Sequence, residues 1–364
     1  MSKKLKKILF FAGGALTVGI VFIVLFWSKI SAYRAGSQTT INAQTVRFKI
    51  EQFSSAEDLA NALQREGIID SKEDFLTVFS YKKLGKDQVA LGMYSIKPNT
   101  SYRDLINGFI KNKRGNGNAE VEVTVTFNNC RTLKDLAKAL SKCTGLKEDS
   151  LLDFLSEEST RKKYGFTLEQ WPAVFMPNTY KMYYDTDAET FVARMVKEYQ
   201  NFWTQDRKQK LIKQGLKEPS EAVTLASIVY SEQSKHAEEW PTIAGLYLNR
   251  LRTGMKLQSD PTFKFCWGDS LDGVERLTAV HRAKDCAYNT YKIQGLPPGP
   301  IYLPPSSVVD AVLNAPKVDY LYMCAKPDYS SLHNFAVDGD EHLRNAKVFQ
   351  DWLTIEQTKK KKNP

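Results

Sequence analysis

Long apolar runs, cysteine and histidine are all scarce in this sequence of 364 residues. A single uncharged apolar run is long enough to cross a membrane, which excludes a polytopic membrane protein. The 5 cysteines and 4 histidines form no Cys-x-x-Cys pair and no His-rich cluster, so the sequence predicts neither a metal site nor a cofactor. An odd number of cysteines leaves at least one thiol unpaired. The hydrophobic content of 42% excludes a disordered chain.

Acidic residues are absent from both ends of the chain, and this accounts for the net charge of +10. Residues 1–34 contain six cations and residues 359–362 are all lysine. Without those ten residues the chain has 41 basic and 41 acidic side chains. A neutral body lacks the clustered cations of a nucleic-acid-binding protein, so we expect no nucleic acid among its partners.

The apolar run predicts a transmembrane helix over residues 8–28. The 20 residues from Ile8 to Trp27 cover roughly 30 Å as a helix, which is the thickness of a hydrocarbon core. Lysines precede the run, so the positive-inside rule places residues 1–7 in the cytoplasm. A cleaved signal peptide is the alternative, but the run is long and lacks a good small-x-small site. We expect a single-pass protein of the cell (inner) membrane, with its folded part periplasmic or extracytoplasmic.

Strand and helix patterns alternate after a linker that ends at residue 44. Val46–Ile50 alternates as a strand, and a helix with a capping box from Ser54 to Glu57 follows it. The same order recurs twice, at 93–96 with 101–110 and at 121–127 with 132–140. We therefore expect an α+β fold built from small strand–helix modules, with a boundary near residue 118.

The next region, residues 149–217, is expected to be mostly helical. An aromatic segment at residues 171–180 interrupts it. Its rings and amides are of the kind that stacks on sugars, and packing between subdomains explains them equally well.

Two further helices precede a set of polar loops. The first begins at residues 219–221 with Ser220 as the expected cap, and the second has Pro241 in its first turn and ends at Gly254. The loops that follow are rich in Asn, Gln, Tyr and Pro. Such loops, held between helices, are suited to binding a polyhydroxyl ligand.

One carboxylate continues the apolar stripe of the first of these helices. Steps of three and four residues along Ala222, Leu225 and Val229 lead to Glu232. Burial raises the pKa of a carboxyl group, as a general acid near neutral pH requires. The alternatives are a glutamate that has turned to solvent and one held by a structural arginine such as Arg250.

Residues 165–350 contain an ordered set of motifs: Leu225-Ala226-Ser227-Ile228-Val229 with Glu232, Asn249-Arg250-Leu251, Gly254-Met255-x-Leu257-Gln258-Ser259-Asp260-Pro261-Thr262, Tyr288-Asn289-Thr290-Tyr291, Gly295-Leu296-Pro297-Pro298-Gly299-Pro300-Ile301, and His333-x-Phe335 with Glu341-His342. Together they resemble the YceG-like endolytic lytic transglycosylases, the MltG family. The resemblance implies a LysM-like α+β region at 45–118 and a mixed α/β catalytic domain at 119–355. The C-terminal lysines predict a basic tail at 356–364.

The resemblance also implies an activity. Family members cleave peptidoglycan glycan strands between N-acetylmuramic acid and N-acetylglucosamine, with formation of a 1,6-anhydro ring and without a cofactor. We expect the chain to terminate glycan elongation beside membrane-bound peptidoglycan synthases. The alternatives are a glycan hydrolase, in which Asp260 activates water, and a non-catalytic peptidoglycan-binding scaffold.

Several site residues follow from the resemblance. The catalytic glutamate of the family falls on Glu232. The polar cleft residues of the family match, by position, Gln258, Asp260, Tyr288, Asn289 and His333. Asp260 is equally suited to holding a loop, and His333 to a structural hydrogen bond. Tyr230 departs from the family, because many members have a glutamate there.

Overall fold

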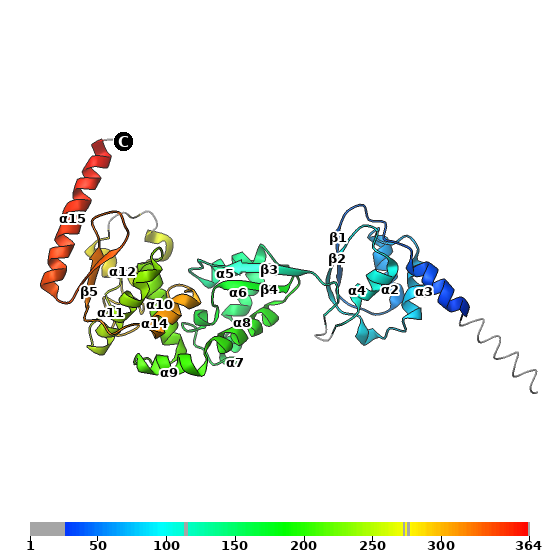
Figure 1. Ribbon diagram of the computed structural model, residues 1–364, viewed down its shortest axis with the longest axis horizontal. Helices are drawn as coiled ribbons and strands as arrows, with labels where there is room; N and C mark the ends of the chain where they lie inside the picture. Colours follow the sequence, from blue (N-terminus) through cyan, green and yellow to red (C-terminus); the bar gives the residue numbers. More distant parts are fainter. Residues whose placement is uncertain (1–25, 113–115, 272–273, 275–276, 363–364) are drawn as a thin grey trace, which may run out of the picture. The chain divides into compact units, whose positions relative to one another are not determined.

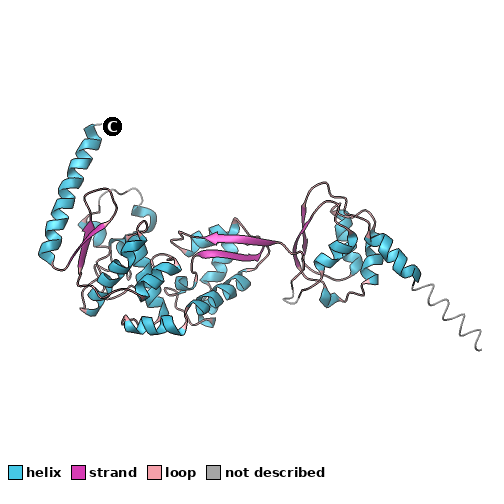
Figure 2. Cartoon of the chain, in the orientation of Figure 1, coloured by secondary structure: helices cyan, strands magenta, loops and turns pink. Residues whose placement is uncertain are grey.

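The computed structural model describes residues 26–112, 116–271, 274 and 277–362 (Figure 1). Within them the chain is a mixed α+β protein of helices and two-stranded sheets (Figure 2). It divides into two compact units, of which unit 1 comprises Met1–Val123 with Lys181–Asp185, and unit 2 comprises Thr124–Tyr180 with Thr186–Pro364. The LysM-like character of residues 45–118 and the expected domain limits stay predictions.

Unit 1 pairs a small sheet with helices around one core. Strand β1 (Val46–Ile50) runs antiparallel to β2 (Gly92–Ile96), with Phe48 opposite Tyr94. The helical elements are α2 (Ala56–Arg65), α3 (Lys72–Tyr81), the short η1 (Lys86–Gln88) and α4 (Tyr102–Phe109). The largest fully buried side chains of this core are Leu63, Ile68, Ile69, Phe75, Tyr94, Tyr102 and Phe109.

The first two predicted strand–helix pairs are confirmed, but the predicted capping box is wrong. Ser55, not Ser54, caps α2, and its hydroxyl accepts a hydrogen bond from the Asp58 N–H. Two adjacent serines can each cap a helix, and packing selects between them. The start at Ala56 places Leu59 in the core.

The third predicted strand pairs elsewhere. Strand β3 (Glu122–Phe127) forms a separate sheet with β4 (Asn178–Tyr183), which comes from the aromatic segment, and α5 (Leu133–Ser141) follows β3. Trp171 is fully buried, and Tyr180 stacks on Phe127 with ring centroids 5.4 Å apart. Packing therefore accounts for these rings of the aromatic segment.

Unit 2 is mainly helical. Its remaining elements are α6 (Glu148–Ser156), α7 (Glu158–Lys163), η2 (Trp171–Val174), α8 (Ala188–Phe202), α9 (Gln205–Lys213), α10 (Pro219–Glu232), η3 (Ala237–Glu239), α11 (Trp240–Arg252), α12 (Asp260–Trp267), η4 (Gly268–Leu271), α13 (Ala279–Arg282), α14 (Ser306–Leu313), β5 (Tyr322–Ala325), β6 (His333–Ala336) and α15 (Gly339–Lys362). Strands β5 and β6 pair antiparallel, and α15 packs against them (Figure 1).

Helix α10 lies at the centre of unit 2. It packs against α11, α12 and α14, and every residue from Ala222 to Val229 is buried. The predicted apolar stripe is therefore part of a helix that is buried on all sides. The predicted Ser220 cap is wrong, because the helix begins at Pro219 and Ser220 lies inside it, buried. The predicted extent of α11 is confirmed, with Gly254 in the left-handed region at φ 69° just beyond it.

The predicted transmembrane helix falls almost wholly outside the described residues, which include only its last positions, 26–28. Among the residues that are described, no helix has the length and apolar character needed to cross a membrane.

Candidate active site

A cleft of about 810 Å³ lies in unit 2, bordered by α11, β5, α15 and the ends of α10 and α12 that face each other. Its polar lining includes Glu232, Gln258, Asp260, Arg282, Tyr291 and His333. The cleft thus collects four of the six residues predicted from sequence. Among the described residues, no group of three His, Cys, Asp or Glu side chains is placed to hold a metal ion.

Glu232 is the last residue of α10, and one of its carboxylate oxygens is fixed. Oε1 accepts hydrogen bonds from the Tyr247 hydroxyl at 2.7 Å and from Ser259 Oγ at 2.5 Å. No described residue donates a hydrogen bond to Oε2. The carboxyl group is therefore oriented through one oxygen, and the other is left for a ligand in the cleft.

The surroundings of Glu232 favour its protonated form. Burial raises the pKa of this carboxyl group, and the nearby charge of Asp260 adds to the rise. Hydrogen bonds from Ser259 and Tyr247, and the proximity of His333, act in the opposite direction without cancelling the effect of burial. A carboxyl group that keeps its proton at a higher pH is suited to general acid catalysis.

Arg250 does not hold Glu232. Its guanidinium donates hydrogen bonds to the backbone oxygens of Leu321 and Leu257, each at 2.6 Å. It therefore joins α11 to the segment before β5 and to the loop before α12. The structural-arginine alternative for Glu232 is wrong, and so is a glutamate turned to solvent.

Ser259 occupies the N-cap position of α12 and is almost fully buried. Its hydroxyl bonds Glu232 instead of a free N–H of the helix. The Thr290 hydroxyl accepts the Ser259 N–H at 2.9 Å and lies 2.8 Å from the Thr262 hydroxyl. The loop that carries Thr290 thus positions the residue that orients Glu232.

A disulfide joins this loop to α12. It links Cys266 to Cys286, while Cys130, Cys143 and Cys324 are free. Cys266 lies within α12, and Cys286 lies four residues before Thr290. The disulfide therefore ties together the two segments that support Ser259.

Both carboxylate oxygens of Asp260 are engaged. Oδ1 accepts a hydrogen bond from the Tyr291 hydroxyl at 2.5 Å and from Arg282 Nε at 3.4 Å, and Oδ2 accepts one from Arg282 Nη2 at 3.3 Å. The Arg282 guanidinium also lies 5.5 Å from the centre of the Tyr291 ring. Asp260 thus lines the cleft as one member of an ion pair.

Gln258 lies at the cleft with an unusual backbone. Its φ is 50°, in the left-handed region that is uncommon for residues other than glycine, and its N–H donates to the Thr290 oxygen at 3.2 Å. Its side chain is exposed. An exposed side chain at the cleft can contact a ligand. That Gln258 binds the substrate stays a prediction.

Two predicted residues do not line the cleft in the described part of the chain. Asn289 is fully buried, and its amide donates to the backbone oxygens of Arg282 and Lys284. Tyr288 packs on Phe265 with ring centroids 4.7 Å apart, and burial raises its pKa to about 12. The structure gives both residues a role in shaping the loop before Tyr291.

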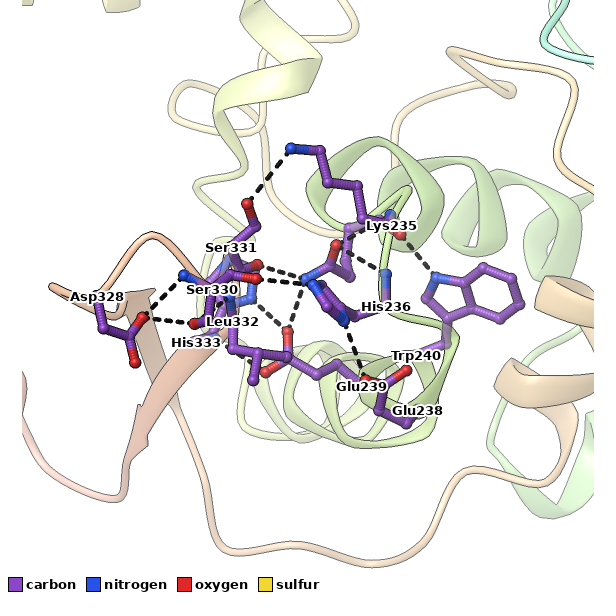
Figure 3. A network of polar contacts seen from close by, with 11 residues as sticks. Lys235, His236, Glu238, Glu239, Trp240, Asp328, Ser330, Ser331, Leu332 and His333 are labelled. Carbon is purple, nitrogen blue, oxygen red and sulfur yellow. Dashed lines mark hydrogen bonds and ion pairs between the residues drawn. The ribbon is translucent and has the colours of Figure 1, made fainter.

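His333 is the first residue of β6, is partly buried, and forms a pair with the buried Glu239 (Figure 3). His333 Nδ1 lies 2.8 Å from Glu239 Oε2, and the His333 N–H donates to Glu239 Oε1 at 2.9 Å. Gln233 Nε2 also donates to Glu239 at 2.8 Å. Burial raises the pKa of Glu239, but these hydrogen bonds outweigh it and hold that pKa below its usual range.

The segment before His333 is attached to the same region. The His236 ring lies 2.7 Å from the Ser330 oxygen, and Lys235 Nζ donates to the Ser331 hydroxyl at 3.4 Å (Figure 3). The turn between α10 and α11 thus fixes the start of β6, and His333 with it.

Sequence reasoning missed three residues of this site: Tyr247, Ser259 and Glu239. Ser259 stands between Gln258 and Asp260 in a motif that carries the resemblance, but its residue type does not indicate a contact with Glu232. Tyr247 and Glu239 gave no local signal, because their partners are distant in the sequence.

Three comparisons place the chain among known proteins. The model of the YceG-like family matches residues 48–348. A protein of Bacillus subtilis (strain 168) named endolytic murein transglycosylase is 27% identical over 297 residues, which cover 78% of this chain and 79% of that protein. A protein of the same name from Streptococcus pneumoniae serotype 2 is 24% identical over 324 residues, which cover 81% of this chain and 57% of that longer protein.

The fold is similar to that of a solved structure. A crystal structure of a YceG-like protein from Listeria monocytogenes superposes with a TM-score of 0.51 at 24% identity, covering 83% of this chain and 99% of that one.

Proposed function

The chain belongs to the YceG-like family, and we propose that it is an endolytic murein transglycosylase. Such an enzyme is a lyase that cleaves peptidoglycan glycan strands internally, at the bond between N-acetylmuramic acid and N-acetylglucosamine. The observation that carries the proposal is the state of Glu232. The pKa of its carboxyl group is raised by burial, Oε1 is held by two hydrogen bonds, and no described residue donates to Oε2.

Glu232 acts first as an acid and then as a base. The protonated carboxyl group donates its proton to the glycosidic oxygen, and the bond from that oxygen to C1 of the muramic residue breaks. The carboxylate then takes the proton of the C6 hydroxyl of the same residue, and the O6 atom bonds to C1. The ring closes as a 1,6-anhydro sugar, no water is consumed, and Glu232 regains its proton.

Tyr247 and Ser259 assist the charged stage of this cycle. Both donate to Oε1, and hydrogen bonds to a charged acceptor are stronger than those to a neutral one. They therefore stabilise the carboxylate after it has released its proton, while burial favours its reprotonation by the C6 hydroxyl in the next step.

A glycan hydrolase is the second candidate. It requires Asp260 as a base that activates water, and this carboxylate is already bound to Arg282 and Tyr291. With donors already on both of its oxygens, this carboxylate has less capacity to bind and orient a water molecule. The pairing of Asp260 thus supports the transglycosylase.

Mass spectrometry of the digests of uncrosslinked glycan strands separates the two candidates. We expect anhydro ends from the wild type and from Asp260→Asn, and no cleavage by Glu232→Gln. A product heavier by one water would show a hydrolase. Glycan release that is unchanged by Glu232→Gln would instead favour a non-catalytic scaffold acting with another enzyme.

We further propose that residues 8–28 anchor the chain in the cell membrane, with the catalytic unit on the extracytoplasmic side. The length of the apolar run and the lysines before it support this topology. A LysM-like region at 45–118 would then bind the glycan, and membrane-bound synthases would supply it. Retention of the full chain in membranes after alkaline washing, and its release on deletion of residues 1–28, tests the anchor.

A further inference from the structure

A second hollow adjoins the cleft in unit 2 and has no part in the reaction described above. Its volume is about 670 Å³, and we call it the basic groove, defined by Asn129, Arg131, Tyr230, Lys264, Phe265 and Tyr302. Leu277 lines both the cleft and the groove. Two hollows that share a wall can hold adjacent parts of one substrate.

The groove begins at the same helix turn as the catalytic glutamate. Tyr230 and Ser231 line the groove, whereas Glu232 lines the cleft. Residues two apart in a helix are separated by roughly 200° around its axis, so Tyr230 and Glu232 lie on opposite faces of α10. The start of α12 divides in the same way, with Asp260 at the cleft and Pro261 at the groove.

The floor of the groove is fixed by hydrogen bonds. The Tyr230 hydroxyl donates to Asn129 Oδ1 at 2.9 Å, and the Tyr230 and Tyr302 rings have centroids 5.2 Å apart. The segment that carries Tyr302 is tied to α10, because the Ile301 N–H donates to Ser227 Oγ at 3.0 Å. The rings are therefore a preformed surface for the backbone and apolar atoms of a ligand.

Among the described residues, the charged side chains that line the groove are both basic. Arg131 and Lys264 line it, and no acidic residue does so in the described part of the chain. Lys264 is exposed and forms no ion pair with a described residue. Arg131 lies 3.6 Å from Asp269, whose side chain is 94% exposed, and such a solvent-facing pair is weak. Both cations are thus available to an anionic ligand.

We propose that the basic groove binds the acidic stem peptide of the muramic residue that is being cleaved. This inference rests on the proposed function, in which the muramic sugar lies against Glu232. The lactyl group of that sugar carries a short peptide with free carboxylates. Arg131 and Lys264 bind these carboxylates, and the Tyr230 and Tyr302 rings pack against the peptide.

Tyr230 has a specific part in this arrangement. A glutamate at this position would bring a negative charge to the groove and repel a carboxylate. The tyrosine that stands here is uncharged and supplies a ring, while its hydroxyl is bonded to Asn129.

Binding is measured first, independently of catalysis. Full-length Glu232→Gln protein is titrated with N-acetylmuramoyl-L-alanyl-D-glutamate and with the same compound amidated at its carboxylates. We expect the free acid to bind roughly tenfold more tightly, since charge-assisted hydrogen bonds are lost on amidation. Adding Arg131→Gln and Lys264→Gln should remove the difference, whereas Lys208→Gln, an exposed lysine on α9, should leave it intact.

Equal affinities for the free acid and the amide would overturn the proposal. So would a double variant that, like Lys208→Gln, still binds the free acid more tightly than the amide. If the double variant fails to fold, as judged by circular dichroism, Lys264→Gln alone is used, because that side chain is exposed.

Cleavage then separates this inference from the proposed function. The wild type is assayed on glycan strands with stem peptides and on the same strands after an amidase has removed them. We expect a preference for the stem-bearing strands in kcat/KM that falls toward unity in the double variant. Equal cleavage of both kinds of strand would refute the binding of the stem peptide in the basic groove. It would leave the proposed transglycosylase activity intact. Tighter binding of the free acid than of the amide, with no cleavage of either kind of strand by the wild type, would refute the transglycosylase activity instead.

Discussion

The hydroxyl of Ser259 lies 2.5 Å from Oε1 of Glu232, although Ser259 occupies the N-cap position of α12. A serine there ordinarily satisfies a free N–H of its own helix, and its loss costs about 1 kcal/mol. Here that hydroxyl serves the carboxylate on another helix. The start of α12 thus gives up a capping bond to orient the proposed catalytic group.

Removal of this hydroxyl should lower activity and shift its pH dependence. Ser259→Ala takes away a donor to the charged carboxylate, and we expect kcat to fall roughly 10- to 100-fold with a smaller change in KM. The hydrogen bond lowers the pKa of Glu232, so its loss should raise that pKa and move the alkaline limb of the pH profile upward. Rates of anhydro-product formation across pH test this.

Ser270→Ala, at an exposed position near α12, is the matched control and should retain the wild-type profile. A Ser259→Ala enzyme with an unmoved alkaline limb would contradict the proposed contact. Tyr247→Phe should have a similar effect on kcat. Because both donors share Oε1, the two changes should not be additive in the double variant.

Glu232 should cost the protein stability at neutral pH. A carboxyl group with a raised folded-state pKa binds its proton more tightly in the folded state, so stability falls as pH rises above about 4.3, the value of an unfolded glutamate. Glutamine cannot ionise and keeps an oxygen that accepts from Tyr247 and Ser259. We expect Glu232→Gln to be more stable than wild type by roughly 0.5–2 kcal/mol at pH 7.

Urea unfolding at several pH values measures this difference, which should vanish below pH 4. A variant that is less stable than wild type at pH 7 would show that the carboxylate is held favourably, contrary to the raised pKa.

Glu239 should behave in the opposite way. Its pKa is lowered in the folded protein, so its contribution to stability is complete above the unfolded value and is lost as pH falls through the folded value. Glu239→Gln weakens the hydrogen bonds from His333 and Gln233, and we expect it to be less stable by roughly 1–3 kcal/mol at pH 7. The difference in stability between Glu239→Gln and the wild type should decrease below about pH 4.

Thermal unfolding as a function of pH tests the role of Glu239. Glu238→Gln, an exposed carboxylate of the same turn whose pair with His236 faces solvent, serves as the control and should change little. A gap between Glu239→Gln and wild type that does not depend on pH would assign the effect to packing instead of charge.

The disulfide between Cys266 and Cys286 should stabilise unit 2. It closes a loop with a sequence separation of 20, for which chain-entropy arguments give about 3 kcal/mol. We expect Cys266→Ser with Cys286→Ser to unfold at lower urea concentration, and reductant to have the same effect on the wild type. Cys143→Ser, which removes a free thiol, should leave the midpoint unchanged.

Local elements could be predicted from the sequence because their signals are local. The alternation of Val46–Ile50 and the Pro241 start and Gly254 end of α11 depend on backbone and side-chain preferences within a few residues. The choice of Ser55 over Ser54 could not be predicted, because both serines have the same preference and only packing distinguishes them.

The site was predicted in part for the same reason. Glu232 was found because its position follows from helical spacing, whereas Asn289 was expected at the cleft and is buried behind it. A polar side chain in a motif can bind a ligand or the backbone, and its residue type does not say which. For Asn289, only the positions of the surrounding backbone oxygens showed that its amide binds the backbone.

The sequence by itself determined that a carboxylate ends an apolar helix, because helical periodicity is a property of consecutive residues. Only the tertiary structure determined which side chains contact that carboxylate. Tyr247 and Ser259 come from other helices, and their approach to Glu232 depends on how α11 and α12 pack against α10. The pKa and orientation of Glu232 depend on burial and on these contacts, which no short stretch of sequence specifies.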